Sequence, residues 1–338
     1  MQSQTQSLPP PAVQQQRVSS FVRAVGMLPI LIILAIAFQL MSGYLLTGDF
    51  ASAWGAGRVL SVQNVAIVAQ QASINIVLAA GMTFVIITGG IDLSVGSVLA
   101  AAAMVGVLTS LDPGFGAFGT VTLALGVGLL LGLANGTLIS VFNLQPFIVT
   151  LGALTAVRGL ARLLGNDQTV FNRDLPFAVI GNGTFMGIPW MVVIALAVVV
   201  ASWLVLRFTV LGVRIYAVGG NPKAARMSGI RVWQIILFTY GISGLLAGLG
   251  GVMSASRLYA ANGLQLGQSY ELDAIAAVIL GGTRFIGGVG SIWGTLIGAL
   301  IIAVLTNGLV LLGVSDVWQY IIKGFVIIGA VILDKLRQ

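Results

Sequence analysis

Residues 189–207 read PWMVVIALAVVVASWLVLR, an apolar run whose single charge, Arg207, stands at its far end. A helix of about 20 apolar residues crosses the roughly 30 Å hydrocarbon core of a bilayer, so this run predicts a membrane-spanning helix. Nine more segments are of similar kind and predict further spans. They are residues 22–46, 62–88, 94–111, 117–142, 146–164, 234–256, 270–287, 291–312 and 317–334.

These segments predict an all-α, polytopic transmembrane protein with about ten spans. Segments 94–111 and 270–287 are short and bounded by glycine. Broken or partly crossing helices of this kind are tolerated where protein surrounds them, so the expected number of complete crossings is eight to ten. Residues 1–20, rich in Gln, Ser and Pro, predict a disordered cytoplasmic tail. Residues 21–338 are then expected to form a single transmembrane domain.

The composition excludes most other classes of protein. Of 338 residues, 58% are hydrophobic and only 7% are charged, whereas about a quarter are charged in an average soluble domain. Cys and His are absent, so the chain has no thiolate nucleophile and lacks the commonest metal ligand. No phosphate-binding G-x-x-x-x-G-K-[ST] motif occurs. We therefore expect no catalytic residue, metal or cofactor in this chain.

The basic residues predict an orientation. The net charge is +7, and in a membrane protein it indicates basic cytoplasmic loops rather than nucleic-acid binding. With ten spans and both ends inside, ten Lys and Arg residues fall in inner segments and four in outer ones. This bias predicts cytoplasmic amino and carboxyl ends.

The inner loop 207–233 has five basic residues and no acidic one. Asn221 suits a helix N-cap, Pro222 the first helical position and Gly229 a left-handed stop, so a short helix is expected between them. Isolated helices of two turns are marginal in water, so this one needs the lipid surface or another protein. Both interpretations stay open on these features alone.

The same stretch, KAARMSG from Lys223 to Gly229, resembles the Glu-Ala-Ala-x-x-x-Gly loop of ABC importer permeases. In that family the helix docks into a groove of a cytoplasmic ATPase. Lys223 replaces the family's Glu, while the two alanines and the final glycine match. The resemblance implies a coupling helix made of residues Asn221, Pro222, Lys223, Ala224, Ala225, Arg226 and Gly229.

Two further motifs sharpen the resemblance. TGGIDLSVGS at 88–97 and YELDAIAAV at 270–278 are similar to the signatures of ribose-, xylose- and galactose-type sugar permeases, with the carboxyl half closest to ribose permeases. The resemblance runs from about residue 60 to the carboxyl end. It implies a multi-pass bacterial inner-membrane protein, as a homodimer or paired with a related permease. The implied partners are a tandem ATPase subunit, which carries ATP and Mg, and a periplasmic sugar-binding protein.

Within the first motif, Gly89, Gly90 and Gly96 let the backbone bend and helices approach closely, as either a gate or a static packing interface requires. Asp92 and Ser94 precede a predicted span and suit its N-terminal cap.

In the second motif, Glu271 and Asp273 stand at the outer end of a predicted span. They are candidates for docking of the binding protein or for an outer gate, and an ordinary helix cap is the alternative.

Amides within predicted spans are candidates for the sugar path, because they both donate and accept hydrogen bonds. These are Gln71, Asn75, Asn135 and Asn307. Contact between helices is the alternative use for each of them. The expected function is the membrane-spanning subunit of an ABC importer for a monosaccharide, ribose first. The alternative is a secondary sugar transporter or facilitator that needs no ATPase.

Overall fold

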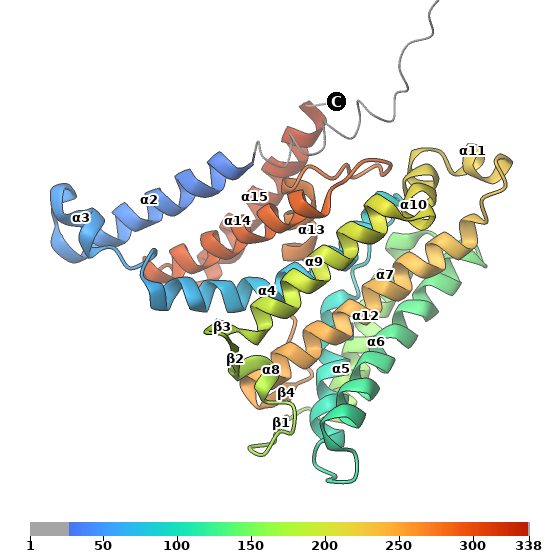
Figure 1. Cartoon of the computed structure of the whole chain (residues 1–338), viewed down its shortest axis with the longest axis horizontal. Coiled ribbons are helices and arrows are strands. Elements are labelled where there is room, and N and C mark those ends of the chain that lie inside the picture. Colours follow the sequence, from blue (N-terminus) through green and yellow to red (C-terminus); the bar gives the residue numbers. More distant parts are fainter. Residues whose placement is uncertain (1–26, 337–338) are drawn as a thin grey trace, which may run out of the picture.

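The computed structural model describes residues 27–336, which form a helical bundle with two small two-stranded sheets (Figure 1). The predicted tail, residues 1–20, lies outside the described residues. The helices are α2 (Leu28–Thr47), α3 (Phe50–Ala56), α4 (Val62–Ile87), α5 (Val95–Thr109), α6 (Gly116–Ser140), α7 (Pro146–Leu164), α8 (Val179–Asn182), α9 (Trp190–Phe208), α10 (Val210–Gly220), α11 (Pro222–Met227), α12 (Val232–Leu258), α13 (Tyr270–Leu280), α14 (Ile292–Leu311) and α15 (Asp316–Leu336).

Each predicted span overlaps one helix, but the helices differ in length; residues 22–26 of the first span lie outside the described residues. Seven of them, α2, α4, α6, α7, α9, α12 and α14, are long and apolar enough to cross a membrane. Helices α5 and α13, with 15 and 11 residues, are shorter than a crossing requires, as their glycine boundaries predicted. Helix α15 has 21 residues and is not among the seven. The chain is therefore polytopic, and the figure of about ten spans stays a prediction.

Several short elements were not predicted. Helices α3, α8 and α10 lie between predicted spans, as do strands β1 (Thr169–Phe171), β2 (Thr184–Phe185), β3 (Ile188–Pro189) and β4 (Ala260–Asn262). Strand β1 pairs antiparallel with β4, and β2 with β3. Elements of two to eleven residues produce no long hydrophobic period, so sequence pattern does not detect them. The all-α expectation therefore holds for the bundle but omits these strands.

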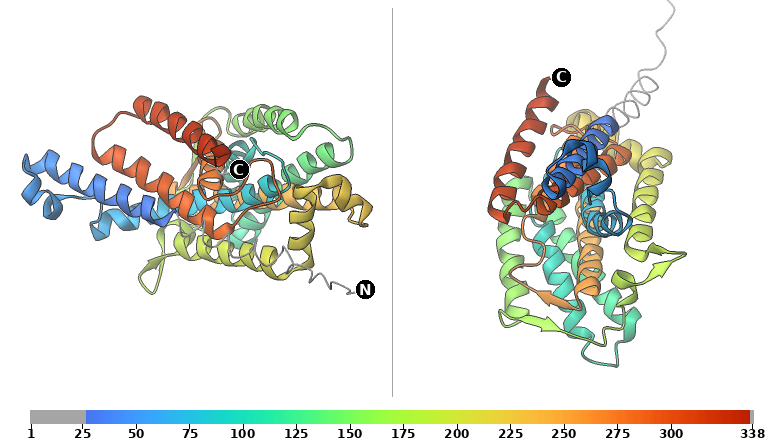
Figure 2. Two further views of the ribbon diagram at one scale, coloured as in Figure 1. Left: turned by 90° about the horizontal axis from the view of Figure 1, so that it is seen from above. Right: turned by 90° about the vertical axis from the view of Figure 1, so that its left-hand side faces the viewer.

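Helices α4 and α12 form the centre of the bundle. They contact each other, and α4 also packs against α9, α13 and α14 while α12 packs against α5 and α6. Helices α2 and α3 lie at the edge beside α14 (Figure 2). Helix α11 lies at one end of the molecule, and the β1–β4 sheet at the opposite end (Figure 1).

Glycines set the close contact between α6 and α12. A Cβ on Gly128 or Gly132 of α6 would collide with the backbone of α12 at Gly244 and Tyr240, and a Cβ on Gly244 would collide with Gly128. Glycines four residues apart lie on one helix face, so the two backbones meet directly. The G-x-x-x-G spacing in the sequence of α6 was a signal for this contact that the sequence analysis did not use.

Candidate functional site

The first signature motif forms the link between α4 and α5, and this partly buried link packs against α12. Gly89 has φ +80°, a left-handed conformation that glycine adopts without strain. A Cβ on Gly90 would meet the hydroxyl of Tyr240. The two glycines therefore have different reasons to be glycine: the first turns the chain, and the second leaves room for a side chain of α12.

Asp92 lies at the centre of a buried hydrogen-bonded group. Its Oδ1 accepts from the backbone N–H and the hydroxyl of Ser94, at 3.0 and 2.6 Å, and its Oδ2 accepts from the hydroxyl of Ser243 on α12 at 2.8 Å. Asn135 on α6 donates a hydrogen bond from its Nδ2 to Ser94 Oγ at 2.9 Å. All four side chains are buried. We call these four residues the Asp92 cluster.

The cluster joins residues that the sequence analysis treated separately. Asp92 and Ser94 were expected to cap α5. Ser94 is its N-cap residue, but the Ser94 side chain makes no cap hydrogen bond, and Asp92 accepts from the backbone N–H of Ser94. Asn135, a candidate for the sugar path, instead bonds to Ser94. Tyr240 and Thr150 add hydrogen bonds from α12 and α7 to the carbonyl of Ile91. The link is thus fixed by α6, α7 and α12, and Ser243, Tyr240 and Thr150 were missed because single hydroxyls carry no spacing signal.

A second fixed link joins α12 to α13. Arg158 on α7 donates from Nη1 to the carbonyls of Leu266 at 2.6 Å and Gly263 at 3.1 Å, and from Nη2 to that of Gly267 at 3.4 Å. Gly267 has φ +68° and lies against Gly96, where a Cβ on either residue would collide with the other's carbonyl. The intramembrane arginine therefore satisfies carbonyls of an irregular link, as polar groups at this depth must.

The two candidate carboxylates of α13 point to different neighbours. Glu271 is half-buried, and its Oε2 lies against Gly96 at the start of α5. Asp273 forms an ion pair with Lys323 of α15, with Oδ2 2.9 Å from Nζ. The Asp273 side chain is only 18% exposed. Both residues thus connect α13 to neighbouring helices.

The candidate amides divide into two groups. Asn307 of α14 exchanges two hydrogen bonds with Asn64 of α4, at 2.8 and 3.0 Å, and both are buried. Gln71 is exposed, and Asn75, one turn further along α4, is half-buried with an enclosed Oδ1 that has no partner among the described residues. Asn135 and Asn307 are therefore engaged between helices, whereas the Asn75 Oδ1 has no partner among the described residues and Gln71 is exposed.

The short helix predicted after Asn221 is present as α11. Asn221 Oδ1 accepts from the backbone N–H groups of Lys223 and Ala224 at 3.1 and 3.0 Å, and Gly229 has φ +81°. Ala225 is only 4% exposed and packs into the core, which attaches α11 to the bundle. Met227, in contrast, is 90% exposed.

Every residue of α11 except Ala225 is exposed: Pro222, Lys223, Ala224, Arg226 and Met227. Nearby, Tyr216 of α10 donates a hydrogen bond from its hydroxyl to the carbonyl of Gly290 at 2.9 Å. Burial raises the pKa of Tyr216 to about 12, so it is a neutral donor.

Among residues 27–336, no three or more His, Cys, Asp and Glu side chains are grouped to bind a metal ion.

Known proteins resemble the chain over most of its length. Residues 64–331 match the family described as branched-chain amino acid transport system / permease component. The chain is 46% identical to the ribose import permease protein RbsC of Bacillus subtilis (strain 168) over 274 residues, which cover 80% of this chain and 84% of that protein.

Two relatives from Escherichia coli (strain K12) give the range of the similarity. Identity to its ribose import permease protein RbsC is 44% over 288 residues, covering 82% of this chain and 87% of that protein. Identity to its galactose/methyl galactoside import permease protein MglC is 38% over 299 residues, covering 82% and 88%. No solved structure matches the chain.

Proposed function

The chain belongs to the family of branched-chain amino acid transport system / permease components, and on that premise we propose that it is the membrane-spanning subunit of an ABC importer for ribose. Ribose is favoured as the substrate because identity to two ribose import permeases is 46% and 44%, against 38% to a galactose/methyl galactoside permease. A periplasmic binding protein delivers the sugar, and a separate ATPase subunit supplies the energy.

The proposed orientation places α11 in the cytoplasm. Ten spans, with both termini inside a bacterial inner membrane, give the excess of Lys and Arg on that side. The partner ATPase receives α11 through its exposed residues, which include Lys223, Ala224 and Met227. Buried Ala225 transmits the movement of α11 to the bundle, because it packs in the core. ATP and Mg belong to that partner.

Two copies of the permease, or one copy and a related chain, enclose the sugar path. Gln71 and Asn75 are the candidates for contact with sugar hydroxyls, since their amides are not used between helices. The signature glycines and the Asp92 cluster define the positions of α4, α5, α6 and α12 around that path. Glu271 and Asp273 position α13.

Reconstitution tests this proposal. We expect the permease, its ATPase and its binding protein in proteoliposomes to accumulate labelled ribose when ATP is present. Proteoliposomes that contain the permease alone should not accumulate ribose. Accumulation of ribose without the ATPase would instead indicate a secondary transporter. Accumulation of galactose but not ribose would show that ribose is not the substrate.

The sugar path has its own test. Replacing Asn75 by Leu should reduce the rate of ribose uptake while the unfolding temperature stays close to that of the wild type. Asn307→Leu is the comparison, because Asn307 is engaged with Asn64 and its loss should lower the unfolding temperature. If Asn75→Leu transports at the wild-type rate, this amide does not contact the sugar.

A further inference from the structure

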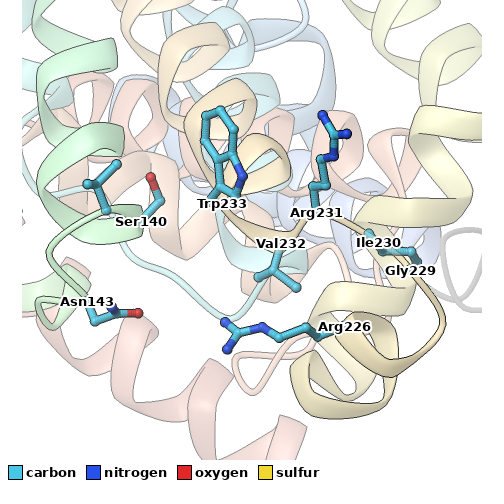
Figure 3. A pocket seen from close by; sticks show the side chains of 9 residues that line it. Ser140, Asn143, Arg226, Gly229, Ile230, Arg231, Val232 and Trp233 are labelled. Atoms are coloured by element: carbon cyan, nitrogen blue, oxygen red, sulfur yellow. The ribbon is translucent and has the colours of Figure 1, made fainter.

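A cavity of about 650 Å³ lies beside α11, where α6 ends and α12 begins (Figure 3). Its walls come from the last residue of α6 and the loop after it, from the α11–α12 connection and from the first turn of α12. The proposed transport cycle assigns no ligand to this cavity. We call it the α6–α12 pocket.

One end of the pocket is positively charged. Figure 3 shows the Arg226 side chain reaching from α11 across the pocket towards Asn143, whereas Arg231 points away from it. Among the described residues, no carboxylate forms an ion pair with Arg226. The N-terminus of α12 also lies at the pocket, and the side chain of its N-cap residue, Arg231, makes no cap hydrogen bond. The positive end of this helix adds to the charge of the guanidinium.

The other end of the pocket is apolar. Val141 and Trp233 line it and are 56% and 46% exposed, and the neighbouring Phe142 is 64% exposed. Tryptophan with this exposure at a helix end is typical of the membrane interface. The hydroxyl of Ser140, which also lines the pocket, is enclosed and has no partner among the described residues.

We infer that the α6–α12 pocket binds the headgroup of an anionic phospholipid. Arg226 and Asn143 bind the phosphate, and Val141 and Trp233 contact the beginning of the acyl chains. A guanidinium donates two parallel hydrogen bonds to a phosphate, which makes arginine suited to this contact. The inference rests on the proposed orientation, which places the pocket at the cytoplasmic leaflet. Arg226 also belongs to the expected coupling helix, so the ATPase subunit is the competing occupant, and the test below distinguishes the two.

The test measures lipid retention by the purified permease without its ATPase or sugar. The probes are phosphatidylglycerol and phosphatidylcholine, added to the full chain in detergent and followed by native mass spectrometry. We expect phosphatidylglycerol to bind more tightly than phosphatidylcholine. Arg226→Gln should weaken phosphatidylglycerol binding about fivefold, since one arginine near an anionic lipid contributes about 1 kcal/mol.

Arg214→Gln is the matched control, because Arg214 is exposed on α10 and does not line the pocket. It should leave binding unchanged. Equal retention of the two lipids, or equal losses in the two variants, would overturn the inference. Displacement of the lipid by millimolar inorganic phosphate would overturn it too, since the site would then take a free anion.

Binding of the ATPase subunit distinguishes a lipid site from a protein interface at the pocket. If Arg226→Gln weakens association with the ATPase subunit and leaves lipid retention unchanged, the pocket belongs to the partner protein and the inference fails. Ribose uptake by the wild-type complex is measured separately. Loss of lipid selectivity with intact uptake refutes only the lipid site, whereas absence of ATP-dependent uptake with intact selectivity refutes only the transport function.

Discussion

The Asp92 cluster and helix α11 are the two regions marked by sequence motifs, and their polar groups are used in opposite ways. In the cluster, both oxygens of the Asp92 carboxylate accept hydrogen bonds, and the neighbouring side chains come from α6, α12 and the N-cap of α5. On α11, Lys223 and Met227 are exposed, and Ala225 alone is buried. Polar groups with internal partners determine where helices lie, whereas exposed ones remain free to contact another molecule.

The glycine contact between α6 and α12 should be the most sensitive to mutation. Gly132→Leu places a side chain into the backbone of α12 at Tyr240 and Gly244. Overpacking costs about 1–3 kcal/mol when side chains yield, and a helix backbone yields less. We expect little or no folded protein by fluorescence size-exclusion chromatography. Gly126→Leu, on the same helix with open space around it, should fold normally.

The Asp92 carboxylate should have the next largest effect. Asp92→Ala leaves the hydroxyl of Ser243 and the N–H of Ser94 without their acceptor, so we expect a loss of about 2 kcal/mol in the free energy of unfolding. Thermal or denaturant unfolding in detergent measures it. Asp174→Ala is the control, because Asp174 is exposed in a loop. Equal stability of the two variants would mean that the cluster does not stabilise the bundle.

Helix α11 should show the reverse behaviour, with association affected and stability unchanged. Met227→Glu puts a charge on the exposed surface and should weaken binding of the ATPase subunit about tenfold, or roughly 1.4 kcal/mol. Met186→Glu is a close control, since Met186 is 89% exposed at the β2–β3 turn and Met227 is 90% exposed. Both variants should unfold at the wild-type temperature, and equal ATPase binding by the two would refute the coupling surface.

The exposed ion pair between Arg162 and Asp167 should have the smallest effect. The Arg162 guanidinium donates two hydrogen bonds to the carboxylate and lowers the pKa of Asp167. A lowered folded-state pKa contributes stability above the unfolded-state value of about 3.9, and this contribution disappears as the pH falls through the folded-state pKa. Because both side chains are exposed, we expect Asp167→Asn to leave the unfolding temperature at pH 7 unchanged within error.

A pH series sharpens this last comparison. If Asp167 contributes at all, the wild type should lose a small advantage over Asp167→Asn only below about pH 4. A clear difference in unfolding temperature at neutral pH would contradict the expectation that this exposed pair contributes little.

Much of the fold was predictable because the signals are local. Hydropathy located every long helix, and the glycine boundaries indicated that α5 and α13 are short. The ends of α11 followed from Asn221, Pro222 and Gly229, since a cap and a left-handed stop depend only on adjacent residues. Helices α3, α8 and α10 and the four strands were missed, because they are too short to produce a period.

The roles of the polar residues required the tertiary structure. Asp92 bonds to Ser243, 151 positions away, and Asn64 to Asn307, 243 positions away. An asparagine in an apolar helix has the same local sequence whether it faces a sugar or another helix. The sequence by itself determined that helices form and where they end, because those depend on nearby residues. Which helices become neighbours, and so which amides are satisfied, depends on packing of the whole chain.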